Sequence, residues 1–151
     1  MAVIDRRDFV LGASAAGLIS ALSIGTAYAE AVPTLEEAMK TAVGDAKPAE
    51  GKVTLKLPEI AENGNTVPFS VSVESPMTKD DYVKAVYIFA KGNPRPDVAS
   101  FMFTPASGEA TVTSRMRLGQ TQDVVALAEM SNGKVYMGSR TVKVTIGGCG
   151  G

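Results

Sequence analysis

The residue best suited to chemistry is Cys149, the only cysteine among 151 residues. Glycine has no side chain to pack and the widest backbone freedom, so the last five residues are predicted to form a flexible, solvated arm. A cysteine that serves packing usually lies in an apolar stretch, where a free thiol behaves as a small hydrophobic group. Here the thiol is instead presented to other proteins, in the sequence Gly147-Gly148-Cys149-Gly150-Gly151.

The rest of the composition offers few other reactive groups. The chain contains no histidine, which is the usual general base near neutral pH and the commonest metal ligand. Without histidine there is no Ser-His-Asp or Cys-His pair, and one cysteine cannot supply the ligands of a zinc or haem site. The net charge of −1 argues against a nucleic-acid binder with a basic face. We therefore expect no metal, no cofactor, no nucleic-acid partner and no enzymatic activity of the chain by itself.

The first 29 residues have the features of an export signal. Arg6 and Arg7 precede an uncharged segment that ends at Ala29 in an A-x-A cleavage pattern, and the paired arginines resemble the twin-arginine signal. A transmembrane anchor is the alternative by length, but the Gly, Ala and Ser content makes the segment weakly hydrophobic. The sequence therefore predicts a signal peptide over residues 1–29 and a mature chain that begins at Glu30. That chain is expected in a bacterial periplasm, with no membrane attachment after cleavage.

Residues 30–146 are predicted to form one domain that begins with a short helix. Thr34 and Glu37 match a capping box, apolar residues recur at helical spacing up to Val43, and Gly44 is a natural stop. After this helix the apolar period changes to two, as in half-buried strands. The predicted strands are Val53–Leu57, Val67–Val73, Tyr82–Ala90, Phe101–Phe103, Ala110–Leu118, Asp123–Met130 and Lys134–Ile146.

About seven short strands separated by Gly, Pro and Asn turns favour an antiparallel sandwich of immunoglobulin-like type over a barrel. The fold class expected is thus all-β, with a short N-terminal helix and a flexible C-terminal arm over residues 147–151. Ile146 is expected to be the last residue held in the sheet. Cys149 lies three residues further on, so an extended arm would carry it about 10 Å outward.

Two pairs of charged residues are candidates for further roles. Arg115 and Arg117 share one face of a predicted strand, because they are two residues apart. They can guide an anion or an acidic partner, but pairing with carboxylates or facing solvent is the favoured interpretation. Asp80 and Asp81 are adjacent on a loop and are expected to be solvated rather than to form an acid/base pair.

Several short segments of the mature chain form a recognisable set. They are Glu62-Asn63-Gly64, Val67-Pro68, Ser75-Pro76-Met77, Asn93-Pro94-Arg95-Pro96, Thr121-Gln122 and the ending Val142-Lys143-Val144-Thr145-Ile146-Gly147-Gly148-Cys149-Gly150-Gly151. Together these segments resemble the SoxY family, and the resemblance covers essentially the whole mature chain. SoxY is the sulfur-carrier subunit of the periplasmic thiosulfate-oxidising system.

The resemblance implies partners and a role for the thiol. It implies an immunoglobulin-like sandwich bound to a second sandwich protein, SoxZ, and a C-terminal cysteine that carries sulfur intermediates covalently. A haem protein, SoxAX, joins thiosulfate to that cysteine, and a hydrolase, SoxB, releases the terminal sulfonate as sulfate. A sulfane dehydrogenase, where present, oxidises the sulfur left behind. Cys149 matches the carrier cysteine, and its flexible surround is matched by Gly147, Gly148, Gly150 and Gly151.

The residues alone leave other roles open. A solvated thiol is mostly protonated at neutral pH, so a carrier thiol must be activated in a partner's pocket. The alternative from a different class is a thiol redox protein that acts through interchain mixed disulfides, which the absence of a resolving cysteine weakens. A lone periplasmic cysteine can also link two copies through a Cys149 disulfide or form an inert tail on a structural subunit.

Overall fold

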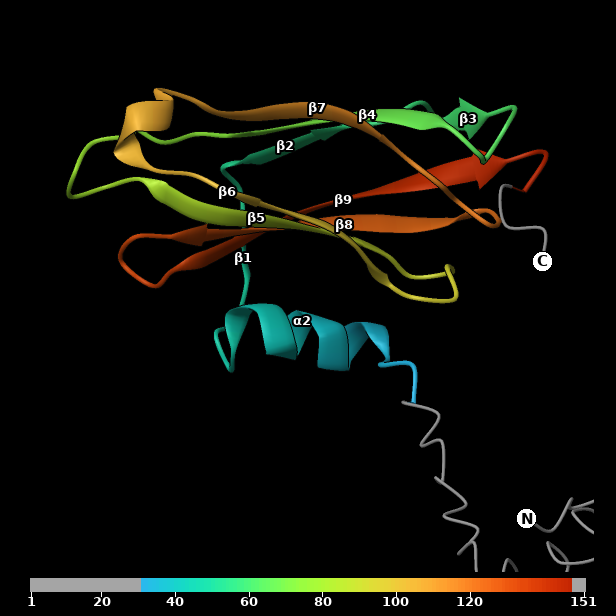
Figure 1. The fold of residues 1–151 in the computed structure, drawn as a ribbon, viewed down its shortest axis with the longest axis horizontal. Coiled ribbons are helices and arrows are strands. Elements are labelled where there is room, and N and C mark those ends of the chain that lie inside the picture. Colours follow the sequence, from blue (N-terminus) through green and yellow to red (C-terminus); the bar gives the residue numbers. More distant parts are fainter. Residues whose placement is uncertain (1–30, 148–151) are drawn as a thin grey trace, which may run out of the picture. The chain divides into compact units, whose positions relative to one another are not determined.

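A computed structural model describes residues 31–147, which consist mainly of β-strands with one short helix (Figure 1). The predicted signal peptide, residues 1–29, lies outside the described residues, as does everything from residue 148 onwards. The elements in chain order are α2 (Leu35–Val43), β1 (Ala49–Glu50), β2 (Val53–Lys56), β3 (Ile60–Ala61), β4 (Val67–Val73), β5 (Val83–Ala90), β6 (Asp97–Met102), the 3-10 helix η1 (Pro105–Ser107), β7 (Ala110–Met116), β8 (Gln122–Met130) and β9 (Val135–Val144).

The strands form two sheets that face each other (Figure 1). The larger sheet has the order β1-β9-β8-β5-β6, with β3 also paired to β9, and the smaller sheet has the order β2-β4-β7. All pairings among β2, β4 and β7 and among β5, β6, β8 and β9 are antiparallel. The predicted all-β sandwich with a short N-terminal helix is confirmed.

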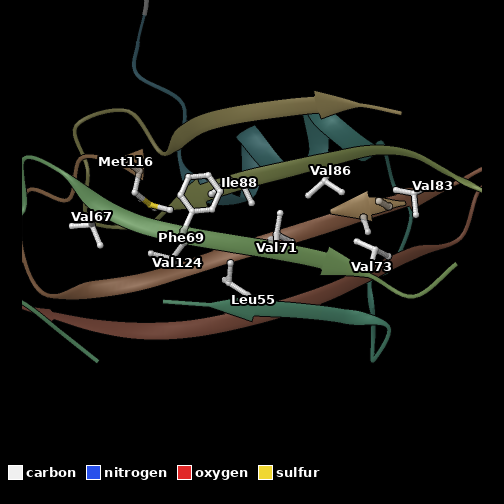
Figure 2. Packing of buried hydrophobic residues seen from close by; sticks show 14 of the residues in the cluster. Leu55, Val67, Phe69, Val71, Val73, Val83, Val86, Ile88, Met116 and Val124 are labelled. Carbon is white, nitrogen blue, oxygen red and sulfur yellow. The ribbon is translucent and has the colours of Figure 1, made fainter. Parts of the chain in front are cut away.

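The core lies between the two sheets and follows from the alternation seen in the sequence. Four residues of β4 point inward and are buried, while Pro68, Ser70 and Ser72 between them are exposed or half-buried. Figure 2 shows these inward side chains in one cluster with residues of the larger sheet, among them Ile88 of β5 and Val124 of β8. Phe69 also stacks at a tilt on Phe101, with ring centroids 6.4 Å apart. The labelled members of this cluster are Leu55, Val67, Phe69, Val71, Val73, Val83, Val86, Ile88, Met116 and Val124.

Helix α2 covers the outer face of the larger sheet, which explains why β5 is apolar on both faces. Thr34 caps the helix, since its Oγ1 accepts from the Glu37 N–H while the Glu37 carboxylate accepts from the Thr34 N–H at 2.8 Å. Ala38 then packs with Phe89 and Leu127 in a second apolar cluster. The predicted capping box is confirmed. No helix among residues 31–147 has the length and apolar character that crossing a membrane requires.

Strand β6 begins earlier than predicted. The sequence places a strand at Phe101–Phe103, whereas pairing with β5 starts at Asp97, opposite Phe89. The turn between the strands is closed by the Ala90 N–H, which donates to the Pro96 carbonyl at 2.8 Å. Pairing therefore resumes directly after the second proline of the turn.

Two strands of the larger sheet were not predicted. Ala49–Glu50 and Ile60–Ala61 each pair with β9, and both pairings are parallel. A two-residue strand carries no measurable period, so neither strand leaves a signal in the sequence. Because they lie along the side of β9 away from β8, they give the last strand hydrogen-bond partners on both of its edges.

Gly138 is a point where the two sheets approach closely, and it gives a stability prediction. A Cβ at Gly138 would lie 2.9 Å from the carbonyl oxygen of Val53 and 3.1 Å from its Cγ1. Gly138→Ala should therefore lower the free energy of unfolding by about 1–3 kcal/mol, as overpacking usually does. Chemical denaturation would measure it. Ser139→Ala, on the exposed neighbour, is the control and should change the stability by less than about 0.5 kcal/mol. Equal stabilities of the two variants would contradict the prediction.

Candidate functional site

The structure describes the approach to the predicted thiol rather than the thiol itself. Cys149 and the glycines at 148, 150 and 151 lie outside the described residues. Strand β9 leads toward them and ends at Val144, after which Thr145, Ile146 and Gly147 complete the described chain. We call residues 144–147 the arm root. Its contacts decide where the chain leaves the sandwich.

One side of the arm root is bonded to β3 and the turn that follows it. The Thr145 N–H donates to the Ala61 carbonyl at 3.1 Å, and its Oγ1 donates to the Glu62 carbonyl at 2.9 Å. The carbonyl of Ile146 accepts from the Gly64 N–H at 2.8 Å. Ile146 is thus held by its backbone beyond the end of β9, although its side chain is 67% exposed.

The other side of the arm root meets the loop between β7 and β8. The Val144 N–H donates to Oγ1 of Thr121 at 3.0 Å. The same loop is bonded to the turn after β3, since the Leu118 N–H donates to the Gly64 carbonyl at 2.8 Å. Leu118 itself is fully buried, which anchors the loop in the core. The arm root therefore lies between two loops that are also bonded to each other.

Gly147 lies where two backbone segments approach closely. The sequence assigns it to the flexible arm, but its backbone passes so close to Gly119 that a Cβ there would overlap the Gly119 carbonyl oxygen. Glycine is thus needed at position 147 because the two backbone segments lie too close together for a side chain, and not only because glycine is flexible. This close approach lies one residue beyond Ile146, the last residue that the sequence predicts to be held in the sheet.

A buried amide supports the loop that Gly147 touches. Gln122, the first residue of β8, is only 7% exposed and is the one buried polar residue of the described chain. Its Oε1 accepts from the Gly92 N–H at 2.6 Å, and its Nε2 donates to Oδ1 of Asn93 at 2.9 Å. Oδ1 of Asn93 also accepts from the Gly119 N–H at 3.0 Å, and its Nδ2 donates to the Arg117 carbonyl at 2.9 Å.

Sequence reasoning assigned no role to Gln122 or Asn93. Gln122 begins a strand whose centre, residues 124–128, is apolar, and this position is a signal because a buried amide must find partners. Asn93 belongs to one of the segments that resemble the SoxY family, but the sequence predicts no contact for its side chain. Its partners lie 24 to 29 positions away along the chain, and local pattern does not indicate them.

The charges predicted as candidates do not form a site. Arg115 and Arg117 are exposed, and neither belongs to the ion pairs of the described chain, which join Lys40 to Asp45, Lys84 to Glu129, and Arg95 to Asp97. This agrees with the solvent-facing interpretation. Asp81 differs from expectation, because it is half-buried and its Oδ1 has no hydrogen-bond partner among the described residues.

Perturbed titrations lie away from the arm root. Hydrogen bonds from the backbone and side chain of Thr34 hold the pKa of Glu37 below its usual value. The hydrogen bond and charge of Glu129 raise the pKa of Lys84, and burial raises that of Tyr87. Within the described residues no three Asp, Glu, His or Cys side chains gather where they could hold a metal ion. The described part of the site therefore holds the chain in place through hydrogen bonds to its backbone.

Comparison with known proteins decides the family. The sulfur oxidation protein SoxY family matches residues 39–149, a range that ends at Cys149. The structure of the sulfur carrier protein SoxY from Chlorobium limicola f thiosulfatophilum is similar with a TM-score of 0.64 and 35% sequence identity, over 75% of this chain and 97% of that one. The chain belongs to the SoxY family. Members of this family are sulfur carriers, so the chain is a sulfur carrier protein and not an enzyme.

The similarity of other solved structures to this SoxY chain is a similarity of fold only. A superoxide reductase (neelaredoxin) from Ignicoccus hospitalis is similar with a TM-score of 0.56 and 17% identity, over 62% of this chain and 80% of that one. A putative superoxide reductase from Thermotoga maritima has a TM-score of 0.53 and 19% identity, over 65% and 87% of the two chains. No curated protein matches the chain in sequence.

Proposed function

We propose that the chain carries sulfur intermediates covalently on Cys149 and presents them to partner enzymes. In the first step the thiol and thiosulfate give Cys–S–S–SO₃⁻, a proton and two electrons, and the electrons pass to a haem partner. In the second step water gives Cys–S–SH and hydrogen sulfate through a hydrolase. A sulfane dehydrogenase, where present, then oxidises the remaining sulfane sulfur. The chain supplies the sulfur atom and the tether, while its partners supply the catalysis.

The observation that carries this proposal is a single cysteine two residues after a hydrogen-bonded arm root in a SoxY chain. The family match ends at that cysteine, and the chain offers no second thiol to bear sulfur. The backbone of the arm root is held by Ala61, Gly64 and Thr121, and Ile146 is exposed at its end. The exposure of the Ile146 side chain, three residues before Cys149, supports a thiol that partners can reach.

The partners and the compartment follow from the family and the N-terminal sequence. We propose a heterodimer with SoxZ and transient contacts with SoxAX, SoxB and a sulfane dehydrogenase. We also propose export to the periplasm by the twin-arginine route, with cleavage after Ala29. The pattern over residues 1–29 supports export, and the mass of the exported chain tests it. A mass that retains those residues would count against cleavage.

Intact-mass measurement tests the covalent step. The chain with its SoxZ partner is incubated with thiosulfate and SoxAX, and we expect its mass to increase by one thiosulfate. Treatment with SoxB should then remove the sulfonate and leave one added sulfur atom. A protein–protein disulfide as the sole product would instead favour the thiol redox role. An unchanged mass would favour a structural subunit.

A further inference from the structure

We propose that Gly147, Gly119, Asn93 and Gln122 form a positioning device that fixes where the tether of Cys149 begins. This inference rests on the proposed carrier role of Cys149. The tether would start at Gly148 and not at the end of β9. Each of these four residues acts through the backbone of the arm root.

The device is a relay of contacts that begins at a buried amide. Gln122 Nε2 donates to Oδ1 of Asn93 at 2.9 Å, and the same oxygen accepts from the Gly119 N–H at 3.0 Å. The carbonyl of Gly119 in turn occupies the space that a side chain at Gly147 would need. A buried polar group that loses its hydrogen-bond partner bears the full cost of its desolvation. Movements that break these hydrogen bonds are therefore unfavourable, and the relay keeps one geometry.

A second close approach, at Gly92, joins the turn after β5 to the loop before β8. Gln120 Nε2 donates to the Gly92 carbonyl at 3.2 Å, while Oε1 of Gln122 accepts from the Gly92 N–H at 2.6 Å. A Cβ at Gly92 would lie 2.8 Å from that Gln120 nitrogen. The turn after β5 and the loop before β8 are thus joined by both backbone groups of one glycine. Together they form a rigid support beneath Gly119.

The position of the last fixed residue sets the reach of the thiol. From Gly147, Cys149 is two residues away, which spans at most about 7 Å. If Val144 were the last fixed residue, Cys149 would lie five residues from it, a span of at most about 18 Å. A shorter tether confines the thiol to a smaller volume and raises its effective concentration at a docked partner's pocket.

Gly147→Ala tests the device, because its Cβ cannot coexist with the Gly119 carbonyl in the present arrangement. We expect amide hydrogen exchange at Gly64 and Thr145, which bond the arm root, to accelerate about tenfold as local opening becomes easier. The Met130 amide, which donates to the Lys134 carbonyl at the far hairpin, is the internal control and should not change. A nitroxide attached to Cys149 should also give a more mobile spectrum. Unchanged exchange and an unchanged spectrum would overturn the proposal.

Asn93→Asp tests the relay without adding volume. The substitution places a carboxylate oxygen against the Arg117 carbonyl in place of the donor that Nδ2 supplies there at 2.9 Å. Asn132→Asp is the matched control, because it makes the same change in the far hairpin, where Oδ1 accepts from the Lys134 N–H at 3.0 Å. We expect faster exchange at Gly64 and Thr145 in the first variant only. The same behaviour in both variants would contradict the relay.

Partner kinetics separate positioning from stability. For Gly147→Ala and Asn93→Asp we expect the KM of SoxB for the loaded carrier to rise about tenfold while kcat stays within about twofold, since a docked thiol reacts as before. An unchanged KM would overturn the proposal. Failure of wild-type Cys149 to accept sulfur would refute the carrier role instead, and the exchange measurements would remain valid because they need no sulfur.

Discussion

Cys149→Ser is expected to abolish sulfur loading completely while the sandwich remains folded. The chain has no other thiol, and a serine hydroxyl does not form the sulfur–sulfur bond that the first step requires. Intact mass after incubation with thiosulfate and SoxAX should equal the mass of the untreated variant. The melting temperature should match that of the wild type within about 2 °C, because substitutions away from the core rarely change stability much.

The control for this variant is a surface residue near the arm root. Thr66→Ser, on the exposed turn before β4, leaves the thiol in place and should load normally. Detection of a covalent sulfur adduct on Cys149→Ser would overturn the assignment of the attachment site. A variant that loads nothing because it is unfolded would be recognised by its melting curve, so the two outcomes stay distinct.

Gly148→Leu is expected to slow every partner step by about a hundredfold while leaving the fold intact. A thiol that must enter an enzyme's channel is followed there by its neighbouring backbone, and a branched side chain beside it obstructs entry. Misplacement of a reacting group by about 1 Å can cost about a hundredfold in rate. Steady-state turnover by SoxAX and by SoxB, each with the purified carrier, would measure the effect.

A graded pair of variants separates obstruction from altered chemistry. Gly148→Ala adds one carbon and should give an intermediate rate. Alkylation of Cys149 by a small reagent such as iodoacetamide should proceed equally fast in both variants and in the wild type, because the reagent needs no channel. Wild-type turnover of Gly148→Leu with SoxAX would argue against obstruction. Slow alkylation would instead indicate that the thiol itself had changed.

Much of the fold could be predicted because its elements carry local patterns. Strand β4 alternates buried and exposed residues from Val67 to Val73, and the helix cap at Thr34 uses residues three apart. Strand β5 is apolar on both faces because it faces a sheet on one side and α2 on the other. Such features depend on near neighbours in the sequence and on burial, and both produce a periodic pattern of apolar residues.

The scaffold of the site could not be predicted in the same way. The contact between Gly119 and Gly147 joins residues far apart in the chain. A pair of glycines has no sequence pattern from which a close approach could be predicted. The position of Gly147 in a glycine run instead suggested freedom. Gln122 and Asn93 are meaningful only after β8 and the preceding loops are placed, because their partners are backbone groups brought together by folding.

The interior place of β9 in the larger sheet has a consequence for protein synthesis. This strand comes last among the described elements, yet it pairs with β8 on one edge and with β1 and β3 on the other. A ribosome that stopped before Val135 would release a chain whose β8 has an open edge and whose β1 and β3 have nothing to join. Such a product should be degraded by proteases rather than fold. A copy that folds would therefore have been translated at least through β9, which ends at Val144, five residues before Cys149.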